Sequence, residues 1–142
     1  MKRTMHLVLA ACIVAAIVVS GCGRAFTEEK KLVDLCRQYT LALAEKKIDQ
    51  AAGLLTGEAL EAMKFAAPII EAAEVTTVIK NFEGKVGQMN KARDRAEVEA
   101  SYIQEQTVEG YGTTVAEFSI VYYLKKVDKD WKIYSIRIVQ KK

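Results

Sequence analysis

Histidine is nearly absent from the 142 residues of this chain: the sequence holds one, His6, close to its start. Cysteine is scarce as well, with three residues at Cys12, Cys22 and Cys36. A body with no histidine and one cysteine after residue 22 cannot build a usual zinc site, a Ser-His or Cys-His nucleophile pair, or a histidine general base. Carboxylate, tyrosine or lysine chemistry stays open. The sequence therefore predicts no metal and no cofactor, and it assigns no catalytic residue.

A strong excess of one charge is also missing. The chain has 21 basic and 18 acidic residues, and two of the basic ones, Lys2 and Arg3, belong to the leader at its start. The other charges nearly balance, which gives no reason to expect a nucleic-acid partner. Basic residues gather around residues 91–95, but acidic residues stand among them, and we interpret this stretch as a solvated loop.

The start of the chain does contain an uncharged apolar run, Leu7 to Val19, preceded by Lys2 and Arg3. The run has the length of the apolar segment of a secretory signal peptide and is shorter than the roughly 20 residues that cross a bilayer core. The positive residues before it favour the cytoplasmic side, so the chain after the run is expected to be exported. The alternative is an uncleaved N-terminal membrane helix whose apolar stretch extends as far as Cys22.

The run ends in Val19-Ser20-Gly21-Cys22, which resembles the lipobox of bacterial lipoprotein precursors. At the position three residues before the cysteine, where Val19 stands here, leucine is the commonest residue of that motif. The resemblance implies cleavage before Cys22 and a diacylglyceryl thioether on its sulfur, with acyl chains such as palmitate, and an amide-linked acyl chain as a further possibility after cleavage. It divides the chain into a signal peptide (1–21), a lipidated cysteine with a short tether (22–26) and one domain (27–142). The body is then expected in the cell envelope, held on the extracytoplasmic side of the cell membrane, or on an outer membrane if the host has one.

Cys36 is the one thiol left to the domain, so no intrachain disulfide can form. It lies on the apolar side of a predicted helix, which favours a buried and inert thiol. A reactive cysteine or an intermolecular bridge is the alternative.

Helical periodicity fills the first half of the domain. Leu32, Cys36, Tyr39 and Leu43 recur at spacings of four, three and four, which predicts an amphipathic helix from Thr27 to about residue 46. A short second helix over 49–55 is expected to be capped by Asp49, and a third to begin after Thr56. Pro68 should make the third helix bend, break or restart. Its buried side is expected to consist of Leu60, Met63, Phe65, Ala67 and Ile70.

Alternation of apolar and polar residues marks the second half as strands. Residues 75–82 fit either pattern, and we expect a helix that decays into extended chain. Strands are then predicted at about 85–89, 96–107, 114–126 and 131–139. In the last one the apolar parity changes after Ile133, which favours a bulge near Tyr134-Ser135 that returns Ile136 and Ile138 to the side of Trp131.

Helices before an antiparallel meander predict an α+β fold, with the helices packed on a curved sheet of about four strands. The long first helix, the short second helix with Leu54 and Leu55, and the terminal Asp130-Trp131-Lys132-Ile133 resemble the NTF2-like (cystatin-like, SnoaL-like) superfamily, including small lipoproteins with domains of unknown function. The resemblance implies a cone whose sheet and helices enclose a cavity.

The candidate pocket consists of polar side chains on the predicted inner face of that sheet and on the first helix: Tyr39, Tyr102, Gln104 and Tyr122. The tyrosines are either ligand hydrogen-bond donors or ordinary core residues. The acids of the same strands fall on the outer parity, as Glu97, Glu99, Glu105 and Glu117.

The function is open to three hypotheses. The first is a noncatalytic lipid-anchored module that binds a small apolar ligand or a protein partner at the envelope. The second is an enzyme of the isomerase or dehydratase kind, with a pocket tyrosine and a carboxylate such as Glu71 or Glu74. The third is a structural homodimer formed through the outer sheet face, where Ile103, Val115, Val121 and Tyr123 are apolar.

Overall fold

The computed structural model describes residues 27–142. The chain divides after Lys31, and the compact unit from Leu32 to Lys142 holds all four strands. In the preceding unit, residues 27–31 are helical. The expected signal peptide (1–21), with its motif Val19-Ser20-Gly21, the lipid site Cys22 and the tether to residue 26 all lie outside the described residues.

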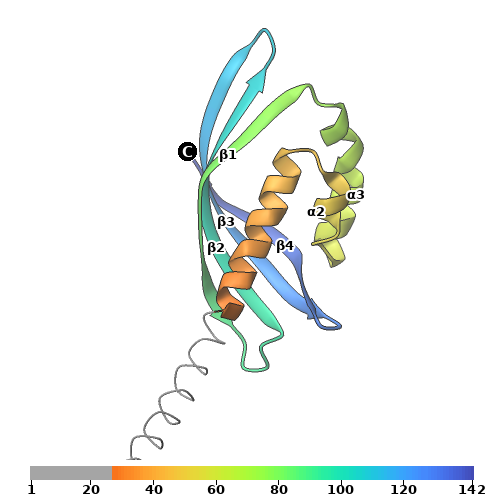
Figure 1. The fold of residues 1–142 in the computed structure, drawn as a ribbon, viewed down its shortest axis with the longest axis vertical. Helices are drawn as coiled ribbons and strands as arrows, with labels where there is room; N and C mark the ends of the chain where they lie inside the picture. Colours follow the sequence, from red (N-terminus) through yellow and green to blue (C-terminus); the bar gives the residue numbers. More distant parts are fainter. Residues whose placement is uncertain (1–26) are drawn as a thin grey trace, which may run out of the picture. The chain divides into compact units, whose positions relative to one another are not determined.

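The unit is an α+β fold of helices and a four-stranded antiparallel sheet, as predicted (Figure 1). Residues 27–44 are helical, and α2 (Ile48–Ala52) and α3 (Gly57–Ala72) come next. The sheet has the order β1-β2-β3-β4, with β1 at Val75–Met89, β2 at Arg95–Val108, β3 at Gly112–Val127 and β4 at Asp130–Lys141. The helices lie on one face of the curved sheet, which we call the inner face.

The core lies between the first helix and the inner face. Strand β2 alternates as predicted, because Ala96, Val98 and Ala100 are buried whereas Glu99 is exposed. Cys36 is also fully buried, and burial raises the pKa of its thiol far above the ordinary value, so the thiol stays protonated. The other large side chains that are almost fully buried are Leu32, Tyr122, Leu124 and Ile133.

The helical expectation for residues 75–82 is wrong. These residues belong to β1, which pairs with β2 from Val75 opposite Val108 onward. Their β-branched side chains suit a strand. The local sequence fits a helix as well, and backbone hydrogen bonds to the neighbouring strand decide in favour of the strand. The pairing shifts between Lys80 and Glu83, where Asn81 has a positive φ of 55°.

The expectations for α3 are wrong in part. Phe65 is 81% exposed, whereas Met63 is buried and Leu60 and Ile70 pack against the core as expected, together with Ala59. The helix does not break or restart at Pro68. Pro68 is exposed, so the backbone hydrogen bond that proline cannot donate is missing on the solvent side of the helix. Thr56 is the N-cap residue as expected, whereas Asp49 lies inside the first turn of α2.

The bulge in β4 is confirmed. Tyr123 pairs with Ser135 and Leu124 pairs with Ile133, so Tyr134 is the extra residue. Beyond it, Ile136 packs on the core, but Ile138 is 59% exposed and does not return to the interior. Ile136 lies against α3, which packs on β4, whereas Ile138 lies farther along the strand.

Among residues 27–142, no helix has the length and apolar character needed to cross a membrane.

Candidate functional site

The inner side of the domain has two adjacent hollows between the helices and the sheet. The first, which we call the glutamine hollow, has a volume of about 270 Å³. Its walls are the end of the first helix, the end of α3 and the start of β1, with Tyr102, Gln104 and Gln106 of β2. The second, which we call the tyrosine hollow, has a volume of about 280 Å³ and is lined by Tyr39, Glu58, Met63 and Ser135 among others. Leu43 and Ile70 line both.

The structure brings together two of the four predicted pocket residues. Tyr102 and Gln104 line the glutamine hollow, because residues two apart on a strand share a face. Tyr39 lines the tyrosine hollow. Tyr122 is 1% exposed, lines neither hollow, and meets Tyr39 edge to face with ring centroids 6.3 Å apart.

Tyr122 is a core residue whose hydroxyl is satisfied inside the protein. Its oxygen lies 2.6 Å from Oγ1 of Thr40, which itself donates to the Cys36 carbonyl at 2.9 Å. Because the Thr40 hydroxyl has one proton to donate, Tyr122 is the donor to Thr40. Burial raises the pKa of Tyr122 far above its ordinary value, and the Thr40 hydrogen bond opposes this only in part. The hydroxyl is therefore neutral and structural.

Tyr102 is held in place by aromatic neighbours on the same face. Its ring stacks on Phe82 of β1 at 5.9 Å and on Phe118 of β3 at 5.4 Å between centroids. The Arg37 guanidinium covers Phe82 at 5.4 Å, and the Lys141 ammonium covers Phe118 at 5.3 Å. Burial, and to a smaller degree Tyr39, raises the pKa of Tyr102 to about 12. Within the described residues its hydroxyl makes no hydrogen bond, which leaves it available to a ligand.

Carboxylates are placed differently from the sequence expectation. Glu71 and Glu74 are exposed and line neither inner hollow. Glu58, which was not among the predicted site residues, lines the tyrosine hollow and accepts a hydrogen bond from Ser135 at 2.9 Å. Among residues 27–142, no hydrogen bond joins Tyr102 or Tyr122 to a carboxylate, and no group of three His, Cys, Asp or Glu is placed to hold a metal ion.

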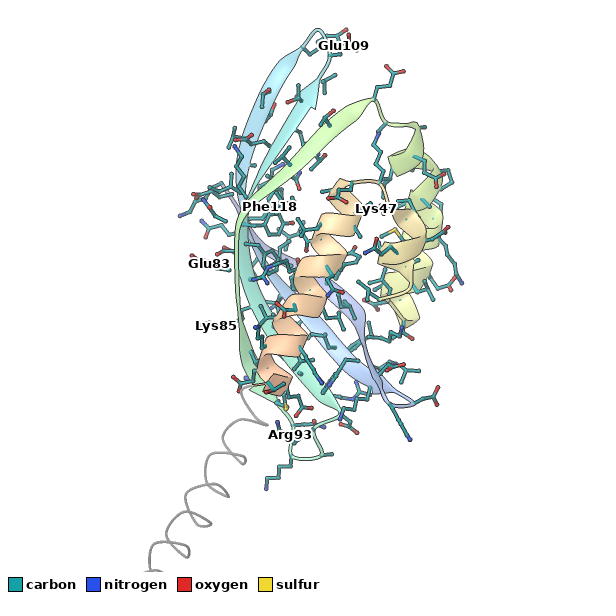
Figure 2. The ribbon with its side chains drawn as sticks, in the orientation of Figure 1. Lys47, Glu83, Lys85, Arg93, Glu109 and Phe118 are labelled. Atoms are coloured by element: carbon teal, nitrogen blue, oxygen red, sulfur yellow. The ribbon has the colours of Figure 1, made fainter. Side chains whose placement is uncertain are left out.

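A further hollow, of about 480 Å³, lies on the outer side of the sheet. Figure 2 shows two of its lining residues, Glu83 and Lys85, on the side of the sheet away from the helices. Lys85 also pairs with Glu99 at 3.3 Å, and both side chains are largely exposed. An exposed rim of paired charges suits a protein surface better than an apolar small molecule, so we take the inner hollows as the candidate ligand site.

Two further lining residues were not predicted from the sequence. Gln106 lies two residues after Gln104 on the same strand, so the alternation of that strand places both side chains on the same face and could have predicted it. Lys46 lines the same hollow from the end of the first helix, and only the position of α3 reveals its role.

No known protein-family profile matches the sequence. No curated protein matches it either.

Solved structures do share the fold. The intermembrane space region of the chloroplast protein ARC6 is 15% identical with a TM-score of 0.63, over 78% of this chain and 95% of its own. A variant of Rv3472 from Mycobacterium tuberculosis, a protein of unknown function, is 16% identical with a TM-score of 0.60, over 84% and 74%. A calcium/calmodulin-dependent protein kinase II association domain from Xanthomonas campestris is 15% identical with a TM-score of 0.54, over 76% and 84%. At these identities the likeness shows the fold alone, and that fold is the NTF2-like α+β cone.

Proposed function

We propose that this protein is an exported, lipid-anchored module that binds a small apolar ligand in the glutamine hollow. The observation that supports this proposal is the kind of residues that line that hollow. Leu43, Ile70 and Ile79 give it apolar walls, and the polar residues Tyr102 and Gln104 line it beside them. Apolar walls with a few polar groups that fix orientation are typical of small-molecule sites.

The anchor is the second part of the proposal and rests on the sequence. Cys22 would carry lipid after cleavage behind Val19-Ser20-Gly21, and two acyl chains at about 0.8 kcal/mol per buried CH₂ would hold the domain stably at the membrane. The tether from residue 23 to residue 26 spans at most roughly 15 Å, so the domain would stay close to the surface. The partners are then the membrane, the ligand and, as an alternative, an envelope protein, with no nucleic acid.

The anchor is tested by labelling cells with radioactive palmitate. We expect the label in the wild-type protein and its complete loss in Cys22→Ala. Cys36→Ala is the matched control, because Cys36 is fully buried and should leave labelling unchanged. Label that persists in Cys22→Ala at the wild-type level would contradict the anchor.

The ligand site is tested by filling one hollow at a time. Ala44 lines the glutamine hollow and Ala62 lines the tyrosine hollow, and both are helical. In a thermal-shift screen of envelope lipids, sterol-like compounds and peptides, we expect ligands that stabilise the wild-type protein. Ala44→Leu should weaken them by about 10-fold or more, because the added carbons occupy the ligand's volume.

Ala62→Leu is the control and should leave the same ligands bound. If Ala62→Leu weakens binding and Ala44→Leu does not, the ligand site is the tyrosine hollow. If no compound stabilises the protein, the small-ligand proposal fails.

A protein partner on the outer face is the second candidate, and the outer hollow with the 59% exposed Val115 and Val139 favours it. A homodimer through this face stays a prediction. Val121, however, is already 7% exposed within one chain, and Ile103 and Tyr123 are half-buried. The mass of the delipidated domain on size-exclusion chromatography distinguishes a dimer from a monomeric binding module.

A further inference from the structure

Lys46 occupies a backbone position that glycine usually fills. It has a φ of 59°, in the left-handed region, directly after the first helix. The amide of Lys47 donates to the Ala42 carbonyl at 2.8 Å, and the amide of Lys46 donates to the Leu43 carbonyl at 3.1 Å. This pair of bonds is the Schellman arrangement, in which glycine is favoured because a Cβ is strained at the left-handed residue. The chain thus keeps a long cationic side chain at a place where its backbone is strained.

The side chain of Lys46 reaches across to the end of α3. Its ammonium donates to the carbonyl of Ala73, the C-cap residue of that helix. The residue is half-buried and lines the glutamine hollow. An ammonium has three protons to donate, and Ala73 takes one. Among the described residues no carboxylate lies within 4.0 Å of it, so the cation has donors to spare.

The charge of the hollow comes from Lys46, the one charged residue among those of the described chain that line it. The others are apolar, or neutral polar residues such as Thr77, Gln104 and Gln106. A partly buried cation without an anion favours an anionic ligand, because pairing with the anion compensates for the hydration that the cation loses on burial. One cation beside neutral amides suits a single negative charge better than a doubly charged phosphate. The apolar walls supply the site for a hydrocarbon body.

We propose that the ligand of the glutamine hollow is a small apolar monocarboxylate whose carboxylate pairs with the Lys46 ammonium. This inference rests on the proposed function, since it names the ligand class of the same hollow. The volume of about 270 Å³ suits a body the size of a short chain or a single ring.

The test uses three probes of one chain length: octanoate, octanamide and octylammonium. They are titrated by calorimetry into the mature chain, residues 22–142, carrying Cys22→Ala so that no lipid or detergent competes. We expect octanoate to bind about 10-fold or more tightly than octanamide, because both can accept a hydrogen bond from the ammonium but only the carboxylate also forms an ion pair with it. Octylammonium should bind more weakly than the amide, because its charge faces Lys46.

Variants then assign the preference to one side chain. Lys46→Met should abolish the difference between octanoate and octanamide, whereas Lys46→Arg should keep it. Lys47→Met is the matched control, because Lys47 is exposed and lines no inner hollow. The comparison of the three probes on the unsubstituted site needs no variant, so it stands even if Lys46→Met fails to fold.

The outcomes separate this inference from the proposed function. If octanamide binds as tightly as octanoate, or if the preference survives in Lys46→Met, the hollow binds ligands but Lys46 serves only to cap α3, and the inference is overturned. If none of the three probes binds while the protein is folded, the proposed function is overturned together with it.

Discussion

Replacing Tyr122 by alanine is expected to lower the free energy of unfolding by about 3–5 kcal/mol. Tyr122 is 1% exposed, so the substitution removes a whole ring from the core and leaves a cavity between β3 and the first helix. It also removes the donor to Thr40. A loss of this size is a large part of the roughly 5–15 kcal/mol by which a typical domain is stable.

Two matched variants separate packing from hydrogen bonding. Tyr122→Phe keeps the ring and loses the bond to Thr40, and should cost about 1 kcal/mol. Tyr111→Ala should stay within about 0.5 kcal/mol of the wild-type protein, because Tyr111 is 90% exposed. Urea denaturation of the mature chain measures all three. If Tyr122→Ala costs no more than Tyr111→Ala, the core has been placed incorrectly.

The protein is expected to unfold between about pH 10 and pH 12. Burial raises the pKa of Tyr39 and of Tyr102 to about 12, and that of Tyr122 further still, whereas tyrosines of the unfolded chain ionise near 10. Below pH 10 both states are neutral at these groups and stability is complete. Above pH 10 the unfolded chain releases protons that the folded chain keeps, so stability falls until the folded-state pKa is reached. Tyr39 alone then accounts for roughly 3 kcal/mol.

The measurement is the urea midpoint from pH 8 to pH 12, with tyrosinate absorbance at each pH. Absorbance from the buried tyrosines should rise together with unfolding. Tyr39→Phe should reduce the loss of stability per pH unit by about 1.4 kcal/mol above pH 10, and Tyr111→Phe, at an exposed site, should not. Tyrosines that all ionise near pH 10 in the folded protein would contradict the burial described for them.

The sequence predicts those parts of the fold that depend on the pattern of apolar residues within a single helix or strand. Ala96, Val98 and Ala100 alternate with Glu97 and Glu99, and a half-buried strand needs that pattern. The bulge at Tyr134 was predictable because the apolar parity changes there. Residues 75–82 were not predictable, since helix and strand both fit them locally and pairing with β2 decides.

The candidate site depends on contacts between distant elements, and it could be predicted only in part. Tyr102 and Gln104 share a strand face, so the strand pattern placed them together. Thr40 lies 82 residues from Tyr122, and no pattern within the sequence indicates that they pair. Lys46 lies in the hollow because the end of α3 lies beside it, and no sequence pattern indicates that position.

The measurement that tests the central claim most directly is a ¹⁵N chemical-shift titration of the mature chain with octanoate. If the ligand enters the glutamine hollow, the side-chain amides of Gln104 and Gln106 and the backbone amides of Thr77 and Ile79 should shift together and saturate. Shifts confined to Ser101 and Ser119 of the outer hollow, or no saturating shift at all, would contradict the account.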